Sequence, residues 1–214
     1  MDQDNIIKIY ARNDNRIQLK MIPGHFVTSQ SHITHYLDLT TMKSRCAEAQ
    51  RIASALAANY EASIPVDTIV CMDGLEVIGA YLAEELTKAG VLSMNAHQTI
   101  YVITPEYTSG SQIILRDNLA PMVKGKHVLI LAASITTGYT IQAAVEAVNY
   151  YGGIVAGLSA IFATTHECLG YPVTSIFDPT SLPDYASFDS RDCPLCKAGQ
   201  HIDALVNSFG YSAL

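Results

Sequence analysis

The stretch from Ser134 to Thr140, SITTGYT, gathers hydroxyl side chains around a single glycine. It follows the apolar run GKHVLILAAS and precedes TIQAAVEAVNYYGG, which predict a buried strand and an amphipathic helix. Backbone N–H groups at a helix start attract anions, a glycine lets the backbone close around one, and threonine hydroxyls add donors. The turn therefore predicts a phosphate site, with an ordinary threonine-capped turn as the alternative.

Strands and helices alternate around this turn. An α/β fold is therefore expected, with a mostly parallel central sheet flanked by helices and ligands beyond the carboxyl ends of the strands. The segment 106–118, EYTSGSQIILRDN, predicts a hairpin or flap. One helix is expected to end at Asn59 and another at Gly90. The expected helices span 42–58, 75–90 and 140–153, and the expected strands span 67–73, 98–105, 125–134, 154–164 and 172–177.

Composition restricts the class of partner. The chain has 214 residues, of which 49% are hydrophobic and 15% charged, and its net charge is −7. An acidic chain of this size predicts one domain with a small-molecule ligand, and neither nucleic acid nor an anionic membrane as partner. The start MDQDN lacks the features of a signal peptide, so we expect a cytoplasmic protein with reduced cysteines.

Three segments are predicted: an N-terminal hood over 1–41, an α/β core over 42–190 and a tail over 191–214 that contains CPLC. The CPLC cysteines are Cys193 and Cys196. His201 is nearby in sequence, and a zinc site there would need its missing ligand from Cys168, His166 or a second subunit, so we expect reduced thiols and no zinc. The histidines of the hood are expected to be polar surface or interface residues without a metal; they are His25, His32 and His35.

Four segments resemble one known family. HVLILAASITTGYTIQAAVEAVNYYGGIVAGLSAIF resembles the phosphoribosyl diphosphate loop and its flanks in type I phosphoribosyltransferases. GHFVTSQSHITHYLDL resembles the hood of the orotate phosphoribosyltransferase branch, and SQIILRDNLAPMVKGKHVLIL and CPLCKAGQHI resemble the hairpin and tail of one bacterial subgroup of that branch. The resemblance runs from about Gly24 to Ile202, and it implies the type I fold and a homodimer.

The resemblance also assigns roles to the loop, whose motif is degenerate here. Family members hold the ribose hydroxyls with two adjacent acidic residues, and Ala132 and Ala133 stand at those positions. Methyl groups accept no hydrogen bonds, so two charge-assisted bonds, each about 1.5 to 3 kcal/mol, are missing. Tyr139 replaces a glycine and can cover the site or stack on a ligand. The phosphate role falls on Ser134, Thr136, Thr137, Gly138, Tyr139 and Thr140.

Other family positions also differ. The pyrophosphate turn corresponds to CMDGLE, with Asp73, Gly74 and Glu76, whose carboxylates would repel pyrophosphate unless Mg²⁺ bridges them. Asp73 as a simple capping residue is the alternative. The strand end YVITPE lacks the family's basic residues, which leaves Arg116 as the candidate catalytic cation. The resemblance assigns base recognition by the hood to Ser31 and His32.

Two functions follow. The first is an orotate phosphoribosyltransferase-like protein that binds ribose 5-phosphate at 134–140, with weak or altered transfer from phosphoribosyl diphosphate to a pyrimidine. If active, it would convert orotate to orotidine 5′-phosphate and pyrophosphate, with Mg²⁺ as cofactor. The alternative is a catalytically inactive regulatory module that binds a nucleotide or ribose phosphate. A turn that binds no nucleotide is a third interpretation.

Overall fold

A computed structural model describes residues 5–60, 64–88, 93–96, 99–108 and 112–214. Its centre is a six-stranded sheet in the order β10-β11-β9-β8-β4-β5. All neighbours are parallel except the β10–β11 pair, which confirms the predicted α/β class. The strands are β4 (Thr68–Cys71), β5 (Tyr101–Ile103), β8 (His127–Ile135), β9 (Ile154–Ala163), β10 (Glu167–Cys168) and β11 (Tyr171–Phe177).

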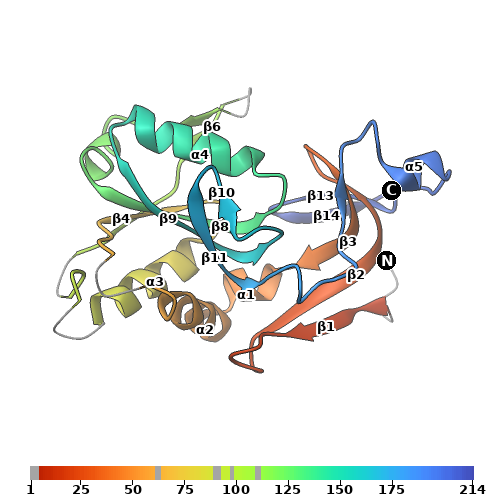
Figure 1. Cartoon of the computed structure of the whole chain (residues 1–214), viewed down its shortest axis with the longest axis horizontal. Coiled ribbons are helices and arrows are strands. Elements are labelled where there is room, and N and C mark those ends of the chain that lie inside the picture. The colour runs from red at the N-terminus through yellow and green to blue at the C-terminus, as the bar shows by residue number, and fades with distance from the viewer. Residues whose placement is uncertain (1–4, 61–63, 89–92, 97–98, 109–111) are drawn as a thin grey trace.

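Helices cover both faces of this sheet. α2 (Cys46–Ala57) and α3 (Glu76–Lys88) lie on one face and α4 (Tyr139–Tyr150) lies on the other (Figure 1). β8 is buried along nearly all of its length because it lies between these two layers. Ala132 belongs to the hydrophobic core beside α4, whereas Ala133 belongs to the core beside α2 and α3.

The helix expected over 42–58 is two helices, so that prediction is wrong in one detail. α1 (Thr40–Ser44) ends and α2 begins at Arg45, whose backbone is extended with φ −96° and ψ 116°. An extended residue interrupts the helical hydrogen-bond ladder. The apolar periodicity continues through both helices, so the pattern did not reveal the break. α2 ends close to the predicted place, where the Asn59 side chain donates to the carbonyl of Ala55 at 2.9 Å.

A second six-stranded sheet joins the two ends of the chain. Its order is β12-β3-β2-β13-β14, with β1 paired to β2, and β13 runs parallel to β2. The hood and the tail, expected as separate segments, therefore share one sheet beside the central one (Figure 1). Its strands are β1 (Ile7–Tyr10), β2 (Gln18–Val27), β3 (His32–Asp38), β12 (Ser187–Phe188), β13 (Ala204–Asn207) and β14 (Gly210–Ala213).

The remaining elements are short. β6 (Glu106–Tyr107) and β7 (Ile113–Ile114) pair antiparallel, which confirms the predicted hairpin. Its tip at 109–111 and the predicted helix end at Gly90 lie outside the described residues. The other short elements are the 3₁₀-helix η2 (Ala120–Met122) and the helix α5 (Pro194–Lys197).

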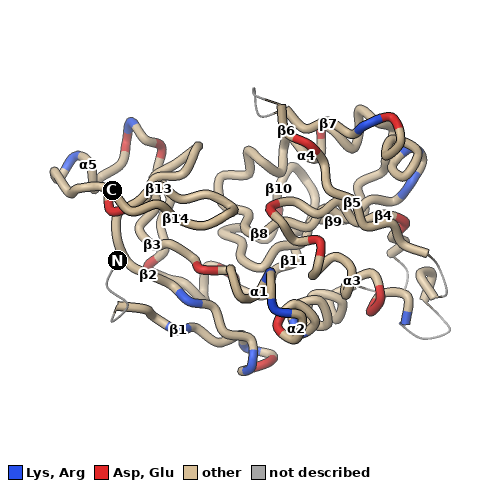
Figure 2. The backbone as a smooth tube through the Cα atoms, turned by 180° about the vertical axis from the view of Figure 1, so that it is seen from behind, with Lys and Arg blue, Asp and Glu red and all other residues tan. Residues whose placement is uncertain are grey.

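Charge is distributed over many elements. In the described part of the chain, lysines and arginines are spread among acidic residues instead of being gathered on one element (Figure 2). Among the helices that the structure describes, none has the length and apolar character needed to cross a membrane.

Candidate functional site

The predicted phosphate turn lies at the carboxyl end of β8, in the middle of the central sheet. Gly138 has φ 80° and begins α4 in the left-handed conformation. Thr164, which follows β9, holds the turn with two hydrogen bonds. Its hydroxyl donates to the carbonyl of Thr136 at 3.0 Å, and its backbone N–H donates to the carbonyl of Ile135 at 2.9 Å. The first N–H groups of a helix have no partner within the helix, so those at the start of α4 are available to bind an anion.

The exposure of the loop side chains fits an open site. Ser134, Thr137 and Thr140 are exposed and Thr136 is half-buried, whereas Ile135 is buried in the core. The Tyr139 side chain is 59% exposed. Hydroxyl groups are therefore available around the helix start.

The two ribose positions contain no polar side chain, yet a carboxylate lies beside them. Ala132 and Ala133 are 0% and 6% exposed. The backbone N–H of Ala133 donates to Oδ2 of Asp73 at 3.3 Å. β4 and β8 are parallel neighbours with Cys71 opposite Leu131, so the turn after β4 meets the end of β8. Spacing along the sequence alone did not reveal this contact.

Asp73 and Gly74 form a left-handed turn, with φ 60° and 74°. Asp is one of the few residues that adopts this conformation at small cost. Glu76, which follows at the start of α3, accepts a 2.8 Å hydrogen bond from the Thr104 hydroxyl beyond β5. The turn expected to bind pyrophosphate is thus bordered by the ends of β5 and β8.

Lys43 supplies a positive charge that sequence reasoning missed. Its Nζ donates to the carbonyls of Asp73 at 2.8 Å and Ser208 at 3.1 Å. Burial lowers the pKa of Lys43, and the nearby Asp73 and Glu76 oppose that change. Burial, and then the charge of Asp73, raises the pKa of Tyr107 to about 12. Lys43 lies in a short helix outside any motif, so no local signal indicated it.

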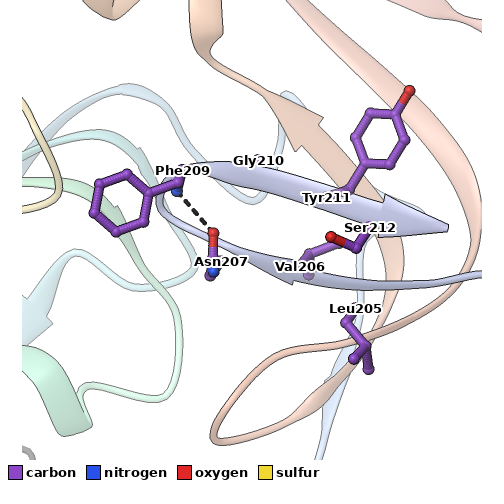
Figure 3. Close-up of a pocket in the computed structure, with 7 residues that line it drawn as sticks. All are labelled: Leu205, Val206, Asn207, Phe209, Gly210, Tyr211 and Ser212. Atoms are coloured by element: carbon purple, nitrogen blue, oxygen red, sulfur yellow. Dashed lines mark hydrogen bonds between the residues drawn. The ribbon is translucent and has the colours of Figure 1, made fainter.

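The contact with Ser208 brings the β13–β14 hairpin to the site. The Phe209 ring, next in sequence, is 94% exposed, and its backbone N–H donates to Oδ1 of Asn207 at 2.8 Å (Figure 3). An exposed aromatic ring therefore lies at the tip of the hairpin. The hairpin borders a concavity of about 360 Å³, lined by Leu205, Val206, Asn207, Phe209, Gly210, Tyr211 and Ser212 (Figure 3).

Arg116, the predicted catalytic cation, is engaged within its own hairpin. Its Nη2 lies 2.6 Å from Oε2 of Glu106, and its Nε donates to Oε1 at 3.0 Å. Both side chains are more than half exposed. The guanidinium is therefore neutralised by a neighbouring carboxylate in this conformation.

The predicted hood residues have other contacts. Oγ of Ser31 lies 3.1 Å from Oγ1 of Thr28 in the turn between β2 and β3. The His32 ring lies beside His25, with His32 Nδ1 2.9 Å from His25 Nε2. Base recognition by Ser31 and His32 stays a prediction.

The CPLC motif has different neighbours from those expected. In the described part of the chain, His25 and His32 adjoin Cys193 and Cys196, in place of the expected His201, His166 or Cys168. A Cβ at Gly138 would lie 3.2 Å from Cys168 Sγ, which places Cys168 beside the phosphate turn. His35 is engaged elsewhere, 2.8 Å from Oγ1 of Thr34 through Nδ1.

Comparison with solved structures defines the class of fold. The chain matches Leishmania donovani UMP synthase with a TM-score of 0.54 at 19% identity, over 76% of this chain and 34% of that one. It matches orotate phosphoribosyltransferase from Aeropyrum pernix with a TM-score of 0.52 at 17% identity, over 76% of this chain and 90% of that one. The chain therefore has the type I phosphoribosyltransferase fold.

Sequence relatives narrow the resemblance to the orotate branch. Orotate phosphoribosyltransferase from Pelotomaculum thermopropionicum is 25% identical over 201 residues, which cover 93% of this chain and 94% of that protein. The protein of the same name from Chlorobium phaeobacteroides is 26% identical over 193 residues, which cover 86% of this chain and 88% of that protein. No protein-family model matches the chain. The predicted resemblance to orotate phosphoribosyltransferases is confirmed, and it extends over nearly the whole chain.

Proposed function

We propose that this chain binds a ribose 5-phosphate ligand at residues 134–140 and transfers phosphoribosyl weakly to a pyrimidine base such as orotate. The observation that carries the proposal is the turn at Gly138, where a left-handed glycine begins a helix at the carboxyl end of the central strand. Exposed hydroxyls of Thr137 and Thr140 flank that helix start. The similarity to orotate phosphoribosyltransferases supports the choice of base.

The surrounding residues support transfer chemistry of low efficiency. In this reaction the anomeric carbon loses pyrophosphate and gains the base nitrogen, so negative charge develops on the leaving group. Lys43 beside Asp73 is the cation available to stabilise that charge while Arg116 is paired with Glu106. Asp73 next to Ala133 offers a carboxylate that can accept a hydrogen bond from a ribose hydroxyl.

Mg²⁺ fits the donor set of this turn. Carboxylate oxygens are the ligands that Mg²⁺ prefers, and Asp73 and Glu76 supply them. When bound, the ion would offset the repulsion between these carboxylates and a diphosphate. The residues of the chain would still bind the phosphate, orient the ribose and hold the base.

A non-catalytic module that binds a nucleotide or ribose phosphate is the second candidate. The observation in its favour is that buried alanines, Ala132 and Ala133, occupy the two ribose positions, and a methyl group accepts no hydrogen bond. Such a module would retain the phosphate turn and use binding to report ligand concentration.

The test measures binding and turnover on the same preparation. Orotate consumption is followed by ultraviolet absorbance with phosphoribosyl diphosphate and Mg²⁺, and a known active enzyme serves as positive control. Binding of uridine 5′-monophosphate is followed by thermal shift. The Thr137→Val, Thr140→Val double variant should bind the nucleotide at least about tenfold more weakly, because it loses hydroxyl donors to a charged group.

A matched control uses Thr87→Val on α3, where the hydroxyl donates to the carbonyl of Glu84 in its own helix. Orotate turnover by the wild-type protein above that of the Thr137→Val, Thr140→Val double variant would support phosphoribosyl transfer. Saturable binding without turnover would support the module. Failure of the wild-type protein to bind any ribose phosphate, with normal folding of all variants, would overturn both candidates.

A further inference from the structure

Four metal-ligating side chains converge between the hood and the tail, outside the turns at 73–76 and 134–140. They are His25, His32, Cys193 and Cys196, and one ligand atom of each lies within 4.8 Å of the others. The first three are buried and Cys196 is exposed. Two regions far apart in sequence contribute: the paired strands β2 and β3 supply the histidines, and α5 with the residue before it supplies the cysteines.

The distances fit tetrahedral zinc. With Zn–N about 2.0–2.1 Å and Zn–S about 2.3 Å, a tetrahedron separates a nitrogen and a sulfur by about 3.6 Å and two nitrogens by about 3.3 Å. His25 Nε2 is 3.6 Å from Sγ of both Cys193 and Cys196, and His32 Nδ1 is 3.3 Å from Cys196 Sγ. The two ring nitrogens are 2.9 Å apart. Small movements would accommodate the ion.

A supporting contact orients one of the imidazoles. Nδ1 of His25 lies 3.1 Å from the carbonyl of Gln200, which can only accept a hydrogen bond. Nδ1 therefore carries the proton, and the lone pair of Nε2 faces the two sulfurs. Metal-bound histidines in proteins usually have such a partner on the second nitrogen. The His25 backbone is also fixed, because its N–H donates to Oδ2 of Asp203 at 2.7 Å.

The charge and spacing of the ligands suit the same ion. Two thiolates and two neutral imidazoles balance the charge of Zn²⁺, so the buried cluster would carry no net charge. The C-x₂-C spacing around α5 is typical of structural zinc sites. Cys193 and Cys196 are both free thiols in the structure, so no disulfide competes for these sulfurs.

We propose that His25, His32, Cys193 and Cys196 bind one Zn²⁺ ion that fastens the C-terminal tail to the hood. Four protein ligands close the coordination sphere, which makes the site structural. The tail continues from this cluster into β13 and β14, and the hairpin between them carries Ser208, whose carbonyl accepts from Lys43. The ion would therefore fix the hairpin beside the ligand site, whether or not that site catalyses transfer.

The test uses the full chain, purified without chelator after expression with added zinc. We expect about one zinc per chain by elemental analysis, and a tetrahedral cobalt spectrum with thiolate charge-transfer bands after exchange for Co²⁺. Cys196→Ser should lose most of the metal. Cys46→Ser, a change to an exposed cysteine on α2, should keep it. Limited proteolysis should cleave 198–214 faster in Cys196→Ser than in Cys46→Ser.

The cobalt spectrum of the wild-type protein keeps the test decisive if Cys196→Ser fails to fold. Displacement of Co²⁺ by Zn²⁺, with loss of the thiolate bands, would support the site. Wild-type protein that is folded but contains little zinc and gives no tetrahedral cobalt spectrum would overturn it. Equal metal content in the Cys196→Ser and Cys46→Ser variants would also overturn it.

Discussion

Oδ2 of Asp73 lies 3.3 Å from the backbone nitrogen of Ala133 and accepts its hydrogen bond. The two residues are 60 positions apart, and they meet because β4 and β8 are parallel neighbours. The loop itself has no carboxylate at the ribose positions. Asp73 is an acidic residue that contacts one of those positions, Ala133, and it can therefore take the place of the family's acidic residues. Its backbone, with φ 60°, holds the carboxylate at the end of the central sheet.

Replacing Asp73 by asparagine should weaken ribose binding and leave phosphate binding unchanged. Asparagine also adopts the left-handed conformation, so the turn should be preserved. Loss of one charge-assisted hydrogen bond of about 1.5 to 3 kcal/mol corresponds to roughly 10- to 150-fold weaker binding of ribose 5-phosphate. Calorimetric titration with ribose 5-phosphate and with inorganic phosphate measures the difference. Equal weakening for both ligands would contradict a ribose role for Asp73.

Moving the carboxylate should recover part of this loss. In the Asp73→Asn, Ala133→Asp double variant, the acidic group returns to the position that the family uses. Ala133→Asp alone would place two carboxylates side by side, and their repulsion should cancel any gain. A double-mutant cycle on ribose 5-phosphate affinity therefore should show a favourable coupling between the two changes. Additive effects would argue against contact between these positions in the ligand complex.

Phe209→Ala should weaken binding of nucleotides while sparing ribose 5-phosphate. The ring is exposed at the tip of the hairpin that Lys43 links to Asp73, so a base can stack on it. Stacking of a base on an aromatic ring contributes about 1 to 3 kcal/mol, or roughly 5- to 150-fold in affinity. Titration with uridine 5′-monophosphate and ribose 5-phosphate separates the two effects. Tyr150→Ala, at the far end of α4 and 84% exposed, is the matched control.

The central fold was predictable because its signals are local. The apolar run of β8 and the periodicity of α3 and α4 each lie within one element, and each element lies close to its predicted range. The second sheet depends on pairing between distant segments. The β13 strand is only four residues long and pairs with β2 through Ala204 and Phe26, a contact that no local pattern specifies.

The same distinction applies to the candidate sites. The turn at 134–140 was found because its hydroxyls and glycine are consecutive. Lys43 contacts Asp73 only through the fold, and its helix has no motif. The histidines of the hood were expected at the surface or an interface, where such residues are more often found. All three are buried, and β2 and α5 bring His25 and Cys193 together, a contact between distant segments that no local pattern indicates.

Glu106→Gln should raise the affinity for pyrophosphate by releasing Arg116. The guanidinium is bound to Glu106 by hydrogen bonds of 2.6 to 3.1 Å, which compete with an anionic ligand. Both side chains are exposed, so the stability of the fold should change little. Pyrophosphate titration of Glu106→Gln, Arg116→Gln and the double variant measures the effect. If the gain persists in the double variant, Arg116 is not the group that binds the anion.

Unfolding at alkaline pH should depend on the ionisation of buried tyrosine side chains, and Tyr60 provides the test. Burial raises the pKa of Tyr60 to about 12, and burial does the same for Tyr36. The folded protein therefore keeps these protons above the unfolded pKa of about 10, where the unfolded chain loses them. Their contribution to the free energy of unfolding is fully present below about pH 10 and is lost as the pH rises toward 12.

The Tyr60→Phe variant should therefore lose less of its free energy of unfolding as the pH rises from about 10 to 12, and it should be less stable than the wild type near neutral pH. The Tyr60 hydroxyl hydrogen-bonds the buried Ser159, and leaving that partner unsatisfied costs about 1 to 3 kcal/mol. Urea unfolding at a series of pH values gives the free energy of unfolding for the wild type, Tyr60→Phe and the exposed control Tyr150→Phe. Because the removed group no longer titrates, the curve for Tyr60→Phe should converge on the wild-type curve between about pH 10 and pH 12. Parallel curves would show that Tyr60 ionises at its ordinary pKa in the folded protein.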